Sequence, residues 1–252
     1  MKRVLITRDG ERAAELATIL TVSGFEVHVR PVTRTRFIDV NPLPDLTRYR
    51  WIVFTSVNGV IGFEGALRKQ GLLMPTEVLV GAIGTATGDA CATRLRKPII
   101  VSQDSNATRF ADELMASDDK FLEGKIIWPC ATGRRPDFEK RMKEAGVSVK
   151  PWECYSTEAI PANDLRPVLA ANVPWDVVVF AAPSAVRAFS AAWPPPWHFE
   201  SVAIGRTTAD ALIQCGVGSP LVSHGTSAND LSAAVVQALA ESKPDATRRG
   251  TL

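Results

Sequence analysis

The chain has 252 residues, of which 46% are hydrophobic and 22% are charged, a composition typical of a globular protein with an ordinary core. Its 29 Lys and Arg residues nearly balance 27 Asp and Glu residues, which leaves a formal net charge of +2. This balance argues against a protein that coats nucleic acid, because such a protein needs a broad basic field. No run approaches the roughly 20 apolar residues that span a bilayer, and the apolar stretch at 4–6 is too short for a secretory signal. We therefore expect a cytoplasmic protein without a membrane partner.

Cysteine and histidine spacing gives no sign of a metal or disulfide framework. Cys91, Cys130, Cys154 and Cys215 include no CxxC pair, which favours free thiols in a reducing compartment. The three histidines form no pair at ligand spacing, so we expect no metal site.

Short apolar runs alternate with stretches of helical period along the chain. Residues 4–6 predict a strand, 11–23 an amphipathic helix, and 25–29 a second strand that follows a left-handed turn at Gly24. Further strands are predicted at 51–54, 78–80, 99–101, 125–128, 147–149, 177–180, 202–204 and 221–222. Several of these are continuously apolar, as in a parallel sheet buried on both faces. The alternation predicts doubly wound α/β architecture.

Two segments interrupt this alternation and predict connectors. Residues 30–36 are basic and begin near a proline, and residues 153–161 are irregular. A third segment, 193–197, contains three consecutive prolines and predicts a stiff loop, because proline fixes φ and forbids helix.

The chain also repeats itself. Residues 82–90 (AIGTATGDA) match 203–211 (AIGRTTADA) at an offset of 121, and residues 54–60 resemble 180–186 at an offset of 126. Several matches in the same order indicate two versions of one α/β unit. Periodicity alone places the boundary between them near residue 122.

The repeat also tests a glycine motif at Gly81, Gly84 and Gly88, which follows a strand and opens a helix. The motif is not GxGxxG, the chain has no phosphate-binding GxxxxGK[ST] loop, and only Gly84 has a counterpart, Gly205, in the second copy. We interpret it as one tight turn per copy and expect no cofactor. A nucleotide-dependent enzyme is thereby disfavoured.

Ligands of open α/β sheets bind beyond the carboxyl ends of the strands. The residues expected there are small, hydroxyl-bearing or basic: Arg8, Ser56, Gly84, Thr87, Thr132, Gly133, Arg134, Ser184, Gly205, Thr207 and Thr208. Any one hydroxyl is explained by helix capping, worth about 1 kcal/mol. Together with helix N-termini they predict an anion-binding edge, and the missing phosphate-loop lysine favours carboxylates over phosphates.

No nucleophile–base pair stands out, and Gly-x-Ser-x-Gly is absent. Tyr155 lies in the second connector, where its phenol could donate a proton or a hydrogen bond. An aromatic side chain that simply packs the connector is an equally good explanation.

These features together resemble the uroporphyrinogen-III synthase family. The residues that carry the resemblance are LITR at 5–8, WIVFTSVNGV at 51–60, GTAT at 84–87, Cys154-Tyr155 after Pro151, AIGRTTA at 203–209 and the final helical stretch at 227–239. The resemblance covers nearly the whole chain.

The resemblance implies two doubly wound, flavodoxin-like parallel-sheet lobes joined by a two-stranded connector. Residues 1–33 and 157–252 would form one discontinuous lobe, and residues 37–153 would form an inserted lobe, with connectors near 34–36 and 154–156. This division differs from the serial one that periodicity alone favours.

The resemblance further implies a cofactor-free lyase of tetrapyrrole biosynthesis. The sequence gives no strong oligomer signal, so we take a monomer as the default. Its substrate would be linear hydroxymethylbilane, which loses water and closes to uroporphyrinogen III with inversion of ring D through a spiro intermediate. Tyr155 would assist the loss of the hydroxyl. The residues that would line a cleft and bind carboxylates are Ser56, Gly84, Thr87, Thr207 and Thr208.

Two positions depart from the family pattern. Asp9 replaces the usual proline of the opening motif, and Ala182 stands at the second-copy counterpart of Ser56, where Ser184 could substitute. A non-enzymatic two-lobed binding protein for a carboxylated tetrapyrrole, or for another polyanion, is the alternative.

Overall fold

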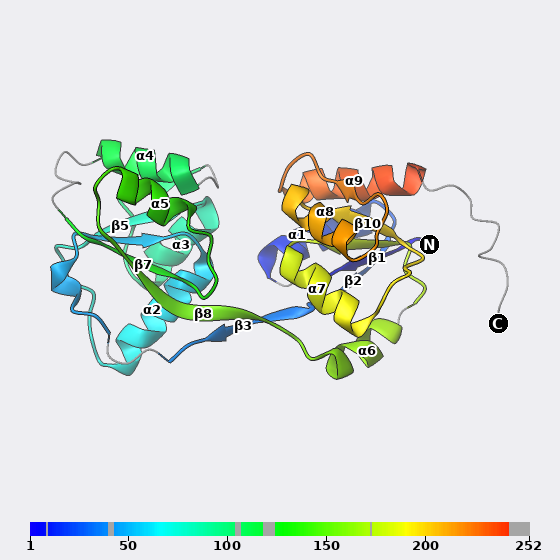
Figure 1. Ribbon diagram of the computed structural model, residues 1–252, viewed down its shortest axis with the longest axis horizontal. Helices are drawn as coiled ribbons and strands as arrows, with labels where there is room; N and C mark the ends of the chain where they lie inside the picture. The colour runs from blue at the N-terminus through cyan, green and yellow to red at the C-terminus, as the bar shows by residue number, and fades with distance from the viewer. Residues whose placement is uncertain (9, 40–42, 104–106, 118–123, 172, 242–252) are drawn as a thin grey trace. The chain divides into compact units, whose positions relative to one another are not determined.

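A computed structural model of the chain describes residues 1–8, 10–39, 43–103, 107–117, 124–171 and 173–241. The chain folds into two compact units. Unit 1 comprises Met1–Arg34 and Glu158–Leu252, and unit 2 comprises Thr35–Thr157. The strands of the described residues form a five-stranded and a six-stranded sheet (Figure 1).

Unit 1 is built on the five-stranded sheet, with strand order β11-β10-β9-β1-β2 and parallel pairing throughout. Its strands are β1 (Arg3–Ile6), β2 (Glu26–Val29), β9 (Val177–Phe180), β10 (Glu200–Ala203) and β11 (Leu221–Val222). Its helices are α1 (Glu11–Val22), α6 (Ala162–Ala170), α7 (Pro183–Ala192), α8 (Arg206–Gln214) and α9 (Ala228–Glu241).

Alternate side chains of each strand in unit 1 enter different cores. Val4 and Ile6 pack with apolar residues of α1 and α9, whereas Leu5 packs with residues of α6, α7 and α8. The continuously apolar strands are therefore buried on both faces, as a sheet between two helical layers requires.

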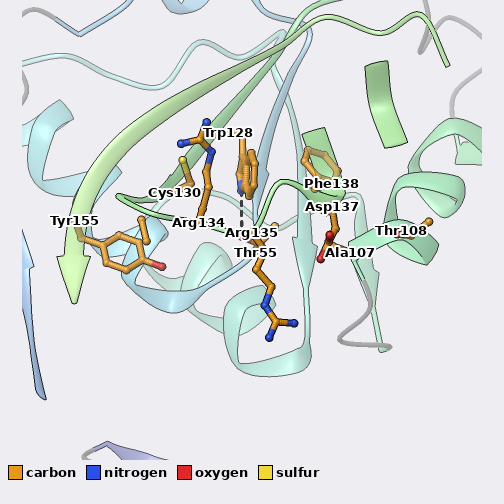
Figure 2. A pocket seen from close by; sticks show the side chains of 11 residues that line it. Thr55, Ala107, Thr108, Trp128, Cys130, Arg134, Arg135, Asp137, Phe138 and Tyr155 are labelled. Carbon is orange, nitrogen blue, oxygen red and sulfur yellow. Dashed lines mark hydrogen bonds between the residues drawn. The ribbon is translucent and has the colours of Figure 1, made fainter. Parts of the chain in front are cut away.

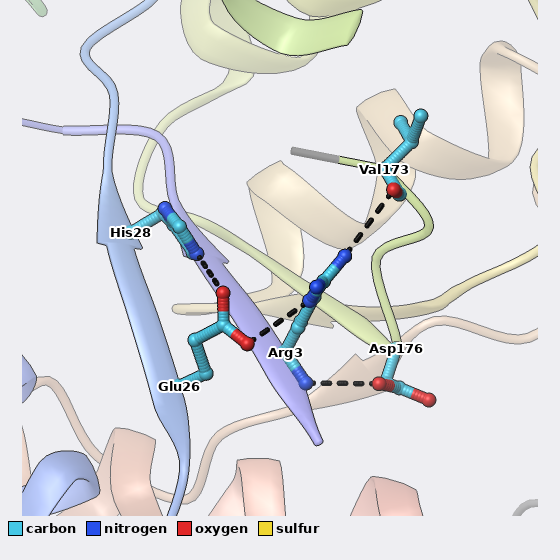
Figure 3. A network of polar contacts seen from close by, with 5 residues as sticks. All are labelled: Arg3, Glu26, His28, Val173 and Asp176. Carbon is cyan, nitrogen blue, oxygen red and sulfur yellow. Dashed lines mark hydrogen bonds and ion pairs between the residues drawn. The ribbon is translucent and has the colours of Figure 1, made fainter. Parts of the chain in front are cut away.

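Ion pairs hold the amino ends of these strands together (Figure 3). The Arg3 side chain donates from Nε to Glu26 at 3.0 Å and from Nη1 to the Val173 carbonyl at 3.2 Å, and its backbone N–H donates to Asp176 at 2.8 Å. His28 Nε2 lies 2.8 Å from the second Glu26 oxygen. The polar residues predicted to bind ligand lie at the opposite, carboxyl ends.

Unit 2 contains the six-stranded sheet, with strand order β3-β8-β7-β4-β5-β6. Its strands are β3 (Thr33–Phe37), β4 (Trp51–Phe54), β5 (Leu79–Ile83), β6 (Ile100–Ser102), β7 (Ile126–Ala131) and β8 (Val149–Ala159). Its helices are the short η1 (Leu46–Arg48) and α2 (Val57–Lys69), α3 (Thr85–Arg94), α4 (Ala107–Ser117) and α5 (Asp137–Glu144). The chain passes between the units within β3 and β8, which are neighbours in the sheet.

Unit 2 repeats the three-layer principle. Ile52 and Phe54 of β4 pack with residues of α2 and α3, while Trp51 and Val53 pack with residues of α4 and α5.

Most predicted strands are confirmed within one or two residues. The chain passes between the units inside both predicted connector segments, but the secondary structure expected for them needs correction. The sequence pattern separates a strand at 147–149 from an irregular connector at 153–161, whereas 149–159 form the single strand β8. The basic segment at 30–36 contains most of β3, which lies at the edge of the sheet. Exposed arginines suit an edge strand because charge discourages pairing with other chains.

The serial division near residue 122 is wrong. That residue itself lies outside the described part of the chain, but β7 on its far side pairs with β4 on its near side in register Trp51 to Ile126. One sheet therefore spans the proposed boundary.

Candidate functional site

A pocket of about 440 Å³ lies in unit 2, beyond the carboxyl ends of β4 and β7 (Figure 2). Its lining comes from strand ends, from the loop after β7 and from the first turns of α4 and α5. The lining residues are Thr55, Ala107, Thr108, Trp128, Cys130, Ala131, Arg134, Arg135, Asp137, Phe138 and Tyr155. Two of the predicted site residues, Arg134 and Tyr155, are among them.

A β-bulge sets the direction of Tyr155. Along β7 and β8, Cys130 pairs with Glu153 but the next residue, Ala131, pairs with Tyr155, so Cys154 is an extra residue in the ladder. Burial follows the same break, because Glu153 is exposed while Cys154 and Tyr155 are both buried. In a regular strand Tyr155 would lie on the same exposed face as Glu153. The bulge turns the Tyr155 side chain toward the interior instead.

Ser56 joins Tyr155 to the start of α2. Its Oγ accepts the Gly59 N–H at 3.1 Å as the N-cap of the helix, and it lies 2.8 Å from the Tyr155 hydroxyl. Either hydroxyl can be the donor of that second bond. The sequence predicted both residues, and the structure brings them into direct contact.

Two glycines allow α2 to approach the strands closely enough for this contact. A Cβ on Gly59 would lie 2.8 Å from the Pro129 carbonyl oxygen in β7, and a Cβ on Gly62 would lie 3.0 Å from the Cys154 sulfur in β8. The first distance is shorter than real Cβ contacts, and the second is tight enough that Cys154 would have to shift by a few tenths of an ångström.

Burial raises the pKa of the Tyr155 phenol above its ordinary value of 10.0, although the hydrogen bond with Ser56 acts in the opposite direction. The side chain is 9% exposed. The phenol is therefore protonated at neutral pH, which makes it a proton donor rather than a base.

Arg134 is held on several sides. Nη1 donates to Glu153 at 2.8 Å, Nη2 donates to Glu139 at 3.2 Å, and the guanidinium carbon lies 5.5 Å from the centre of the Trp128 ring. Arg135 points away from Arg134 on the other side of the loop (Figure 2).

A tight turn carries these arginines. The Arg134 N–H donates to the Ala131 carbonyl at 3.3 Å, and Gly133 has a φ of 73°, a conformation that glycine adopts at least cost. Thr132 is exposed, and its N–H donates to the Tyr155 carbonyl at 2.8 Å. Residues 132–134, which were predicted to bind substrate, form the turn after β7, and this turn is hydrogen-bonded to the Tyr155 backbone.

Several lining residues were absent from the predicted set. Trp128 donates from Nε1 to Thr55 at 3.0 Å, which ties the end of β7 to the end of β4. Thr55 directly precedes Ser56, and that position was the available signal for it. Glu139 and Glu153 carry no such signal, since only folding brings them to Arg134.

The thiol that lines the pocket is not an activated nucleophile. Burial raises the pKa of Cys130 to about 11 and that of Cys154 to about 12. At neutral pH both sulfurs are thiols, whereas the thiolate is the nucleophilic form.

The hydroxyl residues at the starts of α3 and α8 divide into accessible and buried positions. Gly84 and Gly205 are the N-caps, and neither helix receives a side-chain cap. Thr207 is exposed in the first turn of α8, but Thr87 and Thr208 are only 5% and 1% exposed. Packing beneath the helix start leaves the Thr87 and Thr208 hydroxyls little exposed, and carboxylate binding by these two side chains stays a prediction.

The other predicted residues of unit 1 lie at the same kind of edge. Arg8 follows β1 and is half-buried, and Ser184 is half-buried in the first turn of α7. Ala182 is the N-cap of α7 and supplies no capping side chain. Asp9, the departure from the family pattern, lies outside the described residues.

Among the described residues, no three or more His, Cys, Asp or Glu side chains are grouped so that they could hold a metal ion. None of the helices in the described ranges is long and apolar enough to cross a membrane.

Comparisons with known proteins agree with this architecture. Solved structures of uroporphyrinogen III synthases from Helicobacter pylori and Thermus thermophilus superpose with TM-scores of 0.64 and 0.60, at 14% and 21% identity. They cover 94% and 96% of this chain, and 99% and 100% of their own chains. At this identity the likeness establishes the fold.

Sequence relatives and a family model establish the family. A uroporphyrinogen-III synthase from Chlorobaculum parvum is 26% identical over 254 residues, covering 95% of this chain and all of that protein. A relative from Methanocaldococcus jannaschii is 31% identical over 127 residues, which span 48% of this chain and only 51% of that protein. The family model described as Uroporphyrinogen-III synthase HemD matches residues 14–233. The chain therefore belongs to the uroporphyrinogen-III synthase family, the cyclising lyases that act on hydroxymethylbilane in tetrapyrrole biosynthesis.

Proposed function

We propose that this chain closes hydroxymethylbilane to uroporphyrinogen III, with Tyr155 as the proton donor for the departing hydroxyl and Ser56 as its partner. The observation that carries the assignment is the 2.8 Å contact between the two hydroxyls, with Tyr155 at the wall of the pocket. The raised pKa of the phenol supports a donor role.

The hydrogen bonds form a relay that begins in the helix backbone. The Gly59 N–H donates to Ser56 Oγ, the Ser56 hydroxyl donates to the phenol oxygen, and the Tyr155 proton is then directed to the leaving hydroxyl. The C–O bond breaks and water departs with the Tyr155 proton, and the pyrrole N–H proton passes to the phenolate, which restores the phenol and leaves an electrophilic azafulvene. The positive N-terminal end of α2 stabilises negative charge that develops on the phenol oxygen.

Inverted ring closure demands orientation more than further acid–base chemistry. The azafulvene must meet ring D at its already substituted carbon, so the enzyme has to hold a flexible chain in one folded arrangement. The acetate and propionate carboxylates of the substrate are the natural handles for that task.

We assign those handles to the uncapped helix starts. The N-caps of α3 and α8 are Gly84 and Gly205, which have no side chain to occupy the first-turn N–H groups, and Ala182 supplies none to α7. In α9, by contrast, Ser227 and Asp230 cap one another. A carboxylate suits an uncapped start because it meets both N–H donors and the positive end of the helix dipole.

Side chains beside those starts complete the proposed contacts. Thr207 is exposed in α8, Ser184 occupies the first turn of α7, and Arg8 follows β1. In unit 2, Thr132 and Gly133 offer a polar turn next to Tyr155. Anion binding by local donors agrees with a chain whose net charge is only +2.

We further infer that the two units are versions of one flavodoxin-like unit, joined by β3 and β8. The sheet order β2-β1-β9-β10-β11 in unit 1 has the same form as β8-β7-β4-β5-β6 in unit 2. In unit 1 the strand order changes direction between β1 and β9, and in unit 2 it changes direction between β7 and β4. Ligands of open α/β sheets bind at such a reversal.

The cellular setting is part of the proposal. All four cysteines are unpaired, which fits the reducing cytoplasm. We propose a monomer, and light scattering at several concentrations tests this.

The decisive experiment supplies purified protein with fresh hydroxymethylbilane and separates the oxidised porphyrin isomers. We expect isomer III, whereas spontaneous closure in the buffer control gives isomer I. Isomer I alone, at every protein concentration, would overturn the proposed function and support the alternative of a tetrapyrrole-binding protein. That alternative is disfavoured because the family match covers residues 14–233.

A further inference from the structure

We infer that Arg134 is a positioning residue for Tyr155 and does not bind a substrate carboxylate. The inference rests on the proposed function, and it changes the role that the sequence favours for this arginine. Three observations carry it: the partners of the guanidinium, the charge of the cluster, and the route from Arg134 to the tyrosine.

The guanidinium already donates to two protein carboxylates, so only one N–H on each Nη atom and the buried, unpaired Nε–H remain. Nη1 and Nη2 donate to Glu153 and Glu139 at 2.8 and 3.2 Å. The Nε atom is buried, so no ligand reaches it. The Trp128 ring covers one face of the group at 5.5 Å.

The charge of the cluster also disfavours a carboxylate. Glu139 and Glu153 place two negative charges against the one positive charge of Arg134, so the trio carries a net negative charge. A substrate carboxylate that approached Arg134 would meet two like charges within the same cluster. The hydroxymethyl group itself is uncharged and meets no such repulsion.

The route from Arg134 to Tyr155 is short and runs through the bulge. Glu153, the partner of Nη1, is the last residue paired before the register shift, and Tyr155 is the first one paired after it. The turn that carries Arg134 also donates the Thr132 N–H to the Tyr155 carbonyl at 2.8 Å. The ion pair therefore holds the Glu153 side of the bulge that aims the phenol at Ser56, and the Thr132 N–H holds the Tyr155 side.

Kinetics separate a positioning role from substrate binding. We expect Arg134→Met to lower kcat about tenfold or more, because small misplacements of a reacting group are costly, and to leave KM within about twofold. Glu153→Gln should lower kcat in the same direction. The double variant should be no slower than Arg134→Met, since both changes remove one contact. Arg134→Lys should restore only part of the rate, because an ammonium cannot hold two carboxylates in a planar fork.

Arg141→Met is the matched control. Arg141 lies on α5 of the same unit and donates from Nε to Asp112 at 2.9 Å, but neither residue lines the pocket. We expect wild-type kcat and KM. Urea midpoints of all variants establish that each is folded under assay conditions. If Arg134→Met does not fold, the kcat and KM of Glu153→Gln test the positioning role instead.

Two results would overturn the inference. If Arg134→Met raises KM about tenfold at unchanged kcat, and Glu153→Gln lowers KM by releasing the guanidinium to the substrate, then Arg134 binds a carboxylate. Wild-type kinetics in Arg134→Met would also refute it. Both outcomes leave isomer III as the wild-type product, so they differ from a failure of the proposed function.

Discussion

Replacing Gly59 with alanine tests whether close helix–strand packing holds the Ser56–Tyr155 contact. The new methyl would stand 2.8 Å from the Pro129 carbonyl oxygen, and it also lies 3.4 Å from Ser56 Oγ. Both the helix and β7 are regular backbone, so neither can rotate away as a flexible side chain would. We expect α2 to move outward and to carry its N-cap serine away from the phenol.

The same helix provides a matched control for the free energy. Gly65 is exposed in α2, and a Cβ there has nothing within 4 Å. Alanine at an open helix position stabilises by roughly 0.5–1 kcal/mol, and overpacking costs about 1–3 kcal/mol. Gly65→Ala should therefore be more stable than wild type. Gly59→Ala should be less stable than Gly65→Ala by about 1–3 kcal/mol. Both variants gain the same helix propensity from alanine, so that gain cancels when their unfolding free energies are compared.

Urea unfolding followed by tryptophan fluorescence measures this difference, and isomer III formation measures the displacement of the serine. Gly59→Ala should lose turnover, while Gly65→Ala should keep it. Equal unfolding free energies for the two variants would show that α2 is not held as closely as 2.8 Å implies. Wild-type turnover in a destabilised Gly59→Ala would show that the relay through α2 is not needed.

The remaining predictions concern titratable groups. Tyr155→Phe should lower kcat on the order of a hundredfold without changing the urea midpoint, and unchanged turnover would remove the phenol from the mechanism. The chain has only two tyrosines, so in a Tyr49→Phe background the phenolate absorbance reports Tyr155 alone. Its midpoint should lie above 10.0 and should rise further with Ser56→Ala, because that hydrogen bond lowers the pKa; a fall would contradict the assignment. The hydrogen bond with His28 lowers the pKa of Glu26 below its ordinary value of 4.5, so its stabilisation is present above pH 4.5 and is lost as pH falls through the lower folded value. Glu26→Gln should therefore flatten the acid limb of the stability curve, measured by urea midpoints at several pH values.

Strand positions were predictable because the physical signal is local. A continuously apolar run such as 177–180 has to be buried on both faces, and 177–180 is β9 in the structure. β8 was not predictable as one strand, because its outward residues are polar and its bulge breaks the alternation after Glu153. A bulge depends on what the neighbouring strand supplies, which local sequence does not record.

The site was predictable only where chain order carries the information. Ser56 follows an apolar strand and precedes a helix, so its place at the sheet edge was expected, and the structure makes it the N-cap. The partners of Arg134 were not expected, since Glu139 lies on the next helix and Glu153 on the next strand. The sequence indicates that Arg134 lies at the edge of the sheet. It does not indicate that folding pairs this charge with Glu139 and Glu153.

The failure of the division at residue 122 has a topological cause. Suppose that one repeat runs from β1 to α4 and the other from β7 to α9. Each compact unit then combines the opening βαβ segment of one repeat with the later strands of the other repeat. β1-α1-β2 joins the strands that start at β9, and β7-α5-β8 joins those that start at β4. Gly24 and Gly146 end the helices of the two exchanged segments with φ values of 87° and 77°, as equivalent positions should. In that case periodicity follows the repeat along the chain and misplaces the boundary, because each compact unit is packed from segments of both repeats. The same exchange makes β3 and β8 the strands through which the chain passes between the units.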